Sequence, residues 1–265
     1  MSEREKIGII AKYYSDVVGD LEKSNQIWEL QAENFPRSGT PHLFLSRNYA
    51  SMGLYEKGLS ETLEGIRKRS TPFGYEYGIL MGFYMDLNRL AEAKAVYQQV
   101  LARKLDAPFL HLQAYLLGFL EGDAAEMNRQ FAAAAGKLGE DMLISTQSDT
   151  QAYCGRLEKA RELSRRAEEI NRRSDQKETA AKWLIDAALR EVEIGNPERA
   201  RETTAAALGL APTGYIQTVA ALAFARAGDS VRAQKMEDDL AKAYPRNTML
   251  TVMAIGCPRS APPWR

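Results

Sequence analysis

A turn residue followed five positions later by a small residue recurs along this chain. The turn residues stand 34, 35, 34, 33, 40 and 33 positions apart: Gly19, Gly53, Asn88, Gly122, Gly155, Gly195 and Gly228. The residues five positions after them are Ser24, Gly58, Ala93, Met127, Ala160, Ala200 and Ala233, of which only Met127 is not small. A unit of this length cannot bury its apolar side chains alone. The spacing therefore predicts a row of similar units in which each unit packs mainly on its neighbours.

The unit from Leu45 to Ile66 shows what each repeat is made of. Its apolar residues are spaced as on a helix that ends near Met52, and again as on a second helix that starts near Tyr55. Gly53 lies between them, as a turn residue does. Each unit is therefore predicted to be a helix, a turn and a second helix.

The repeats resemble the tetratricopeptide repeat, whose pattern is W-x2-L-G-x2-Y, then A-x3-F, then P over about 34 residues. The resemblance is closest in NYASMGLYEKG (Asn48–Gly58), in YMDLNRLAEAKAVY (Tyr84–Tyr97) and in GNPERARETTAAALGLAP (Gly195–Pro212), and it covers about residues 5–246. The fourth and fifth units depart most, because Gly118 and Gln151 stand where the first-helix tyrosine belongs. The resemblance implies an all-α fold: an α-α superhelix, or TPR solenoid, of about seven helix-turn-helix repeats.

The predicted organisation is one TPR array over residues 1–255 and an irregular tail over 256–265. Its repeats span 5–38, 39–72, 74–107, 108–140, 141–176, 178–213 and 214–246, with a partial eighth helix at 247–255. The polar sequence STQSDTQ predicts a short first helix in the fifth unit, and the second helix there is predicted to run long, from Leu157 to about Arg173. The tail is either an irregular terminus or the place where a longer array has been cut.

Two segments resemble something narrower than a general repeat. EREKIGIIAKYYSDVVGDLEKSNQIWELQAENFPR (Glu3–Arg37) and SDTQAYCGRLEKARELSRRA (Ser148–Ala167) are similar to the TPR region that follows the kinase domain in bacterial eukaryotic-like serine/threonine kinases. The chain contains no H-R-D or D-F-G motif, so the kinase itself is not in it.

Charge and composition narrow the class of partner. The chain has 35 Lys and Arg against 35 Asp and Glu, which removes the electrostatic case for nucleic-acid or membrane-surface binding. No apolar run reaches the length of a membrane span, and the N-terminus has no signal-peptide core. The two cysteines, Cys154 and Cys257, give neither a metal-site spacing nor a disulfide framework. A cytoplasmic location is expected.

No local motif indicates catalysis. The metalloprotease, P-loop, nucleophile-elbow and dinucleotide-binding patterns do not occur. His42 and His111 are expected to be packed or at the surface rather than catalytic. Arginines of the 161–173 segment interleave with glutamates, which predicts a solvated helix face. We expect a protein that is not an enzyme and has no cofactor and no metal.

In tetratricopeptide proteins the first helix of each unit lines a concave groove. Helical phase counted from the turn residues assigns to that side Ile9, Tyr13, Leu43, Arg47, Tyr75, Met85, Asp86, Phe109, Leu112, Leu116, Phe119, Asp149 and Tyr153. The alternative is that several of them pack between adjacent units. Family members that bind a C-terminal carboxylate carry Lys and Asn at set places on their first helices. Leu43 and Arg47 occupy those places here, so binding of a chaperone C-terminus is not expected.

This set is mostly apolar and aromatic, which suits a peptide with hydrophobic anchors. The predicted function is a non-catalytic scaffold that binds a peptide or protein segment. The alternative is a regulatory or sensor segment of a bacterial kinase or other signalling protein.

Overall fold

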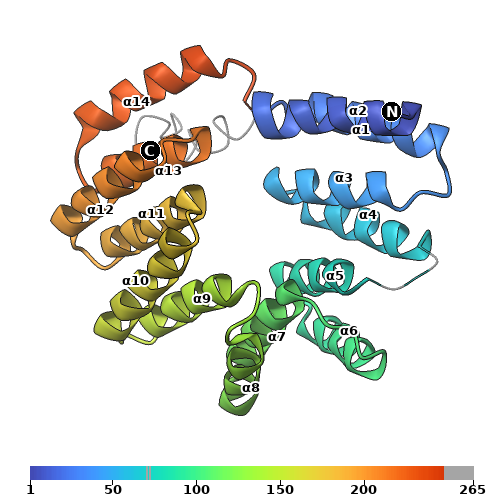
Figure 1. The fold of residues 1–265 in the computed structure, drawn as a ribbon, viewed down its shortest axis with the longest axis horizontal. Helices are drawn as coiled ribbons and strands as arrows, with labels where there is room; N and C mark the ends of the chain where they lie inside the picture. Colours follow the sequence, from blue (N-terminus) through green and yellow to red (C-terminus); the bar gives the residue numbers. More distant parts are fainter. Residues whose placement is uncertain (70, 72, 248–265) are drawn as a thin grey trace, which may run out of the picture. The chain divides into compact units, whose positions relative to one another are not determined.

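The computed structural model describes residues 1–69, 71 and 73–247 (Figure 1). Over these residues the chain forms fourteen α-helices and one π-helical segment, and no strand. The elements are α1 (Glu3–Lys12), η1 (Tyr13–Val18), α2 (Leu21–Asn34), α3 (Thr40–Ser51), α4 (Tyr55–Arg67), α5 (Gly74–Asp86), α6 (Leu90–Ala102), α7 (Pro108–Glu121), α8 (Ala124–Ala134), α9 (Glu140–Tyr153), α10 (Leu157–Arg173), α11 (Lys177–Glu193), α12 (Pro197–Leu210), α13 (Gly214–Arg226) and α14 (Ser230–Ala243).

Consecutive helices pair into hairpins, and the hairpins pack in two compact units. Among the described residues, unit 1 comprises 1–135 and 246–247 and contains α1 to α8. Unit 2 comprises 136–245 and contains α9 to α14. In unit 1 the second helix of each hairpin lies against the first helix of the next, α2 on α3, α4 on α5 and α6 on α7. Unit 2 repeats this arrangement with α10 on α11 and α12 on α13. The predicted all-α repeat fold is confirmed.

Each hairpin turns at a residue in the left-handed backbone region. All seven of the turn residues have positive φ, from 56° at Asn88 to 81° at Gly195. Glycine and asparagine adopt this region at low cost, and it allows the next N–H to bond back to the end of the first helix. Leu54 N donates to Tyr49 O at 2.8 Å, and Asp229 N donates to Phe224 O at 2.8 Å. The turn residues read from the sequence therefore end the first helices as expected.

The small residue after each turn is where neighbouring hairpins approach each other. Ser24, Ala93, Ala160 and Ala200 are at most 1% exposed. A Cβ atom on Gly58 would lie 2.3 Å from Phe83 Cζ of the next hairpin. At the same place in the preceding pair, Asn48 Nδ2 donates to Ser24 Oγ at 3.0 Å. A side chain of the next first helix thus packs on the small residue of the second helix before it.

The fourth hairpin has no small residue five positions after its turn, and a close approach instead lies between its own two helices, α7 and α8. Met127 is half-buried, and the preceding residue, Glu126, is buried instead. Gly118 on α7 makes room for it, since a Cβ there would lie 3.2 Å from Glu126 Cβ. The buried carboxylate accepts a hydrogen bond from Tyr97 OH at 2.7 Å. The small residue has moved from the second helix to the first.

The prediction of a short first helix in the fifth hairpin is wrong, because α9 is 14 residues long. Two of its buried polar side chains have internal partners: Ser148 Oγ donates to Ala160 O at 2.5 Å, and Thr150 Oγ1 donates to Gln147 O at 3.0 Å. The predicted long α10 has 17 residues, but α11 also has 17, so the 40-residue spacing comes from both helices.

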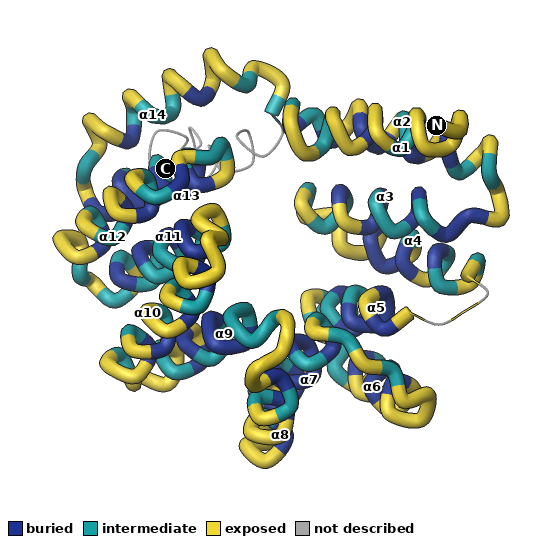
Figure 2. Tube along the Cα trace, in the orientation of Figure 1, coloured by how far each residue is buried: buried dark blue, intermediate teal, exposed yellow. Residues whose placement is uncertain are grey.

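Each of the two units contains buried residues that form a core of its own (Figure 2). In unit 1, buried side chains of α4 to α7 form one cluster around Met81, Phe83 and Leu117. In unit 2 the cluster of α11 to α13 is built largely from alanines and includes Ile185 and Ile216. The single array over residues 1–255 stays a prediction, and the expected eighth helix and tail lie outside the described residues, apart from residue 247.

The close approach of α3 to the end of α4 gives a test of the packing. A Cβ on Gly39 would lie 2.5 Å from the main-chain oxygen of Gly65, whereas nothing lies within 4 Å of a Cβ on Gly209. We expect Gly39→Ala to lower the free energy of unfolding by about 1–3 kcal/mol. Gly209→Ala, in an open part of α12, is expected to raise it by about 0.5–1 kcal/mol. Urea denaturation measures both, and a loss of stability in Gly209→Ala as large as in Gly39→Ala would contradict this packing.

Candidate interaction surfaces

The residues assigned to a groove differ in how far they are exposed at the surface. Seven are exposed: Ile9, Tyr13, Arg47, Tyr75, Asp86, Asp149 and Tyr153. Five are half-buried: Leu43, Met85, Phe109, Leu116 and Phe119. Leu112 is buried, at 8% exposure, and packs between helices. Asp149 and Tyr153 belong to unit 2 and the others to unit 1, so the structure gives two surfaces, and a shared binding role for these residues stays a prediction.

The π-helical segment η1 changes the phase of the first helix. Asp20 N donates to Tyr14 O, six residues back, whereas in the next hairpin Leu54 N donates to Tyr49 O, five residues back. A π-helical turn inserts one extra residue. When the hairpins are aligned on this carbonyl, Tyr13 corresponds to Asn48 rather than to Arg47. The sequence gives no clear signal for such an insertion.

Phe73, Tyr75 and Phe109 form an aromatic cluster at the surface of unit 1. The ring centroids of Tyr75 and Phe109 are 5.4 Å apart with the planes tilted by 44°, and those of Phe73 and Tyr75 are 6.3 Å apart. Phe73 is 51% exposed and Tyr75 39% exposed. Two of the three residues were assigned to the groove from the sequence, and the structure brings them into contact.

A stripe of glycines on α5 holds this cluster in place. Gly74, Gly78 and Gly82 follow each other at every fourth position and so share one face of the helix. A Cβ on Gly78 would lie 2.8 Å from Phe109 Cδ1, so the phenyl ring rests on the backbone of α5. The G-x3-G-x3-G spacing was the available sequence signal for this close approach of α5 and α7.

Arg69 borders the aromatic cluster. Its guanidinium carbon lies 5.7 Å from the centre of the Phe73 ring, within the range of a cation–π contact. The same guanidinium forms an ion pair with Glu76, whose side chain is 3% exposed. Burial raises the pKa of Glu76, and Arg69 opposes that shift. The charge of Arg69 is therefore already paired within unit 1.

The candidate residue Asp149 of unit 2 lies among charged rather than aromatic side chains. Arg190 Nη2 lies 2.5 Å from Asp149 Oδ1, and Arg190 Nη1 donates to Ser148 Oγ at 2.9 Å. Lys182 Nζ lies 2.7 Å from Asp186 Oδ2 and 4.3 Å from the centre of the adjacent indole ring. With Tyr215 these residues form the charged face of unit 2, of which the sequence had singled out only Asp149.

The surrounding protein shifts the pKa values of Asp149 and Tyr215. Although 59% of the Asp149 side chain is accessible, surrounding protein raises its pKa, Arg190 lowers it, and Asp186 adds a small further rise. Although Tyr215 is 39% exposed, the protein around its ring, with a smaller effect of Asp186, raises the pKa of Tyr215 to about 12. The charged face thus holds its groups in a setting that disfavours unpaired negative charge.

The arginine-rich segment of α10 is only partly a solvated face. Arg172 and Arg173 pair with glutamates one turn earlier, as predicted. Arg161 instead reaches α11, with Nε and Nη2 at 2.8 and 2.9 Å from the two oxygens of the buried Glu191. This bidentate pair lowers the pKa of Glu191 and links two hairpins.

The histidines are packed, in agreement with the sequence interpretation. His42 Nδ1 lies 2.7 Å from Glu61 Oε2, and His111 Nδ1 lies 2.6 Å from Gln130 Oε1. Within the described part of the chain no group of three His, Cys, Asp or Glu side chains is placed to hold a metal ion. In the same residues no helix is both long and apolar enough to cross a membrane. The expectations of no enzyme activity and no cofactor stay predictions.

No protein-family model matches the chain, and no curated protein matches it. Solved structures do match. The Rap conjugation gene regulator of the plasmid pLS20, in complex with the Phr* peptide, aligns with a TM-score of 0.56 and 15% identity over 94% of this chain and 75% of that one. A tetratricopeptide repeat protein from Parabacteroides merdae ATCC 43184 gives a TM-score of 0.49 and 10% identity over 95% of this chain and 98% of that one.

A chain of the APC/C hetero-tetramer Cut9-Hcn1 aligns with a TM-score of 0.42 and 13% identity over 95% of this chain, which spans 45% of that chain. At these identities the likeness concerns the fold alone. The fold defines this chain as an all-α helical-repeat protein. One of the structural neighbours reported above is described as a tetratricopeptide repeat protein.

Tyr215 offers a test of the charged face. Because its pKa is raised from 10.0 to about 12 in the folded chain, its contribution to stability is complete below pH 10 and is lost as the pH rises toward 12. We expect the free energy of unfolding to fall more steeply over this range in the natural chain than in Tyr215→Phe. Denaturation series at several pH values measure the difference, and Asp186→Asn should shift the titration of Tyr215 to lower pH. Identical pH profiles of the natural chain and Tyr215→Phe would contradict the enclosure of this phenol.

Proposed function

We propose that this chain is a non-catalytic interaction scaffold and that unit 1 binds a peptide segment through the aromatic cluster. The observation that carries the proposal is the set of three contacting rings at the surface, two of them 39% and 51% exposed. Large aromatic side chains left accessible on a folded surface are enriched at protein interfaces. The cluster supplies the hydrophobic anchor site, and the peptide supplies a hydrophobic or aromatic side chain.

The cluster is suited to binding because it is already ordered. Phe109 rests on the glycine stripe of α5, and Arg69 lies over Phe73, so the rings lose little freedom when a ligand arrives. Binding sites with fewer side chains to immobilise keep more of their interaction free energy as affinity. Aromatic rings that meet at a tilt also offer both faces and edges to a ligand ring.

The comparison with solved structures supports a peptide as the partner. The Rap regulator that shares this fold was solved with a peptide bound. A shared fold supports a peptide as the kind of partner, and it does not indicate the sequence of that peptide. The equal numbers of acidic and basic residues in the chain also favour a protein partner over nucleic acid.

Replacement of Tyr75 tests this function directly. Peptides selected from a random phage-displayed library on the natural chain are measured by fluorescence polarisation against variants. We expect Tyr75→Ala to raise the Kd at least about tenfold, which is roughly 1.4 kcal/mol, because an anchor ring is removed. Tyr55→Ala is the matched control, since Tyr55 has the same 39% exposure on α4 outside the cluster, and it should leave the Kd unchanged.

Failure to select any peptide, or an equal effect of Tyr55→Ala, would overturn the proposal. Phe109→Ala should weaken binding as well, but it also uncovers Gly78, so its helicity and stability have to be measured beside its affinity. A loss of helicity in proportion to the loss of binding would identify Phe109 as part of the core.

A second proposal concerns the context of the scaffold. The similarity of residues 3–37 and 148–167 to the region that follows bacterial serine/threonine kinase domains favours a regulatory segment of a signalling protein. The test is the coding sequence around the gene. An in-frame kinase upstream of Met1 supports this proposal, and a stop codon directly upstream rejects it.

A further inference from the structure

The aromatic cluster is one end of a longer surface on α5 and α7, two helices that pack on each other within unit 1. On α5, Tyr75, Gly82 and Asp86 follow each other at intervals of seven and four positions, so they share one face of the helix. The rise of an α-helix separates Tyr75 from Asp86 by about 16 Å along the axis. We call the strip from the aromatic cluster to Asp86 the α5–α7 surface.

The side-chain amide of Gln113, on α7, lies in the middle of the α5–α7 surface. Its Nε2, Oε1 and Cδ atoms are 3.5, 3.5 and 3.6 Å from the place where a Cβ of Gly82 would stand. Gln113 is only 7% exposed, yet its amide has no hydrogen-bond partner among the described residues. Such a group costs free energy until a partner satisfies it. A peptide bond of a ligand supplies both the acceptor and the donor that this amide lacks.

Asp86, at the other end of the α5–α7 surface, carries a charge that the described part of the chain does not pair. Asp86 is exposed, and the surrounding protein raises the pKa of its carboxyl, with no neighbouring positive charge opposing the rise. Asp149 of unit 2, in contrast, is paired with Arg190. A cation brought by a ligand would therefore find an acceptor at Asp86 that no internal cation occupies.

We propose that the peptide bound at the aromatic cluster carries a lysine or arginine that pairs with Asp86, and that Gln113 bonds to the peptide main chain between the two ends. An extended chain advances about 3.3 Å per residue, so the basic residue stands about five positions from the hydrophobic anchor. This inference rests on the proposed function, because the aromatic cluster supplies the first of its three contacts.

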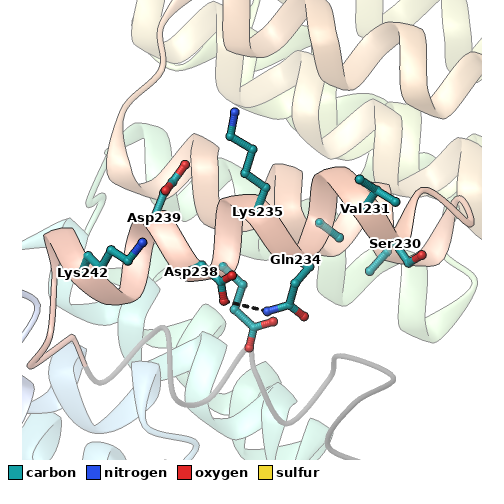
Figure 3. A pocket seen from close by; sticks show the side chains of 10 residues that line it. Ser230, Val231, Gln234, Lys235, Asp238, Asp239 and Lys242 are labelled. Atoms are coloured by element: carbon teal, nitrogen blue, oxygen red, sulfur yellow. Dashed lines mark hydrogen bonds between the residues drawn. The ribbon is translucent and has the colours of Figure 1, made fainter.

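The hollow beside α14 in unit 2 shows no comparable preference for one charge. It has a volume of about 700 Å³, and Figure 3 shows Lys235 and Lys242 in its wall together with Asp238 and Asp239. Its amide group is already used, since Gln234 Nε2 donates to Asp238 Oδ1 at 2.7 Å. The exposed Asp239 therefore provides a control aspartate outside the α5–α7 surface.

Fluorescence polarisation with peptides selected from the phage library on the natural chain tests the proposal. Each peptide is synthesised as selected and with its basic residue replaced by glutamine. We expect Asp86→Asn to raise the Kd of the basic form about threefold to tenfold and to leave that of the glutamine form unchanged. Added salt should reduce the difference between the two forms. Asp239→Asn should leave the Kd of both forms unchanged.

Gln113→Met keeps the length of the buried side chain and removes its amide. We expect this variant to raise the Kd of both peptide forms about threefold to tenfold, because the lost hydrogen bond involves the main chain and not the basic residue. Circular dichroism and urea denaturation check that the helices of the variant are intact. A variant that folds and binds both forms as tightly as the natural chain overturns the role of Gln113.

The results also separate this inference from the proposed function. Selected peptides without a basic residue four to six positions from the hydrophobic anchor overturn the inference, and so does an unchanged Kd of the basic form in Asp86→Asn. In both cases the proposed function stands if Tyr75→Ala still weakens binding. An unchanged Kd in Tyr75→Ala, or a library that yields no peptide, overturns the proposed function and this inference with it.

Discussion

The packing of one first-helix side chain on the small residue of the preceding hairpin is the contact on which the rest of this structure depends. The contact requires a close approach, and an added Cβ atom would prevent it. A Cβ built on Gly58 would lie only 2.3 Å from Phe83 Cζ. Repeat arrays hold together through such nearest-neighbour interfaces, since a single hairpin cannot bury its apolar face. The turn residues with positive φ contribute to this contact, because they set the direction in which the second helix of a hairpin continues after the first.

The same constraint decides where large side chains are left at the surface. In α5 the glycine stripe lets α7 approach so closely that Phe109 spreads over the backbone of Gly78 and joins the ring of Tyr75. The aromatic cluster is therefore a consequence of hairpin packing as well as the proposed binding site.

Much of the fold could be predicted because its signals are local. A residue with positive φ between two helical patterns, and a small residue five positions later, needs no knowledge of distant parts of the chain. The sequence interpretation failed where polar side chains find partners that only the folded chain supplies. The serines and threonines of α9 led to the prediction of a short helix. In the structure Ser148 Oγ donates a hydrogen bond to a carbonyl of the next helix, and Ser148 is buried. The buried Glu126 beside Gly118 and the Arg161–Glu191 pair are of the same kind.

By itself the sequence determined the helix-turn-helix unit, its number of copies among the described residues and the residue types at the turns, because each depends on interactions within about ten residues. Only the tertiary structure decided which candidate residues reach the surface. Leu112 and Leu116 stand on the same helix four positions apart, yet Leu112 is buried and Leu116 is only half-buried, since the rest of the protein covers the first more completely than the second. The phase of Tyr13 likewise follows from a π-helical turn, whose extra residue is accommodated by packing against α2.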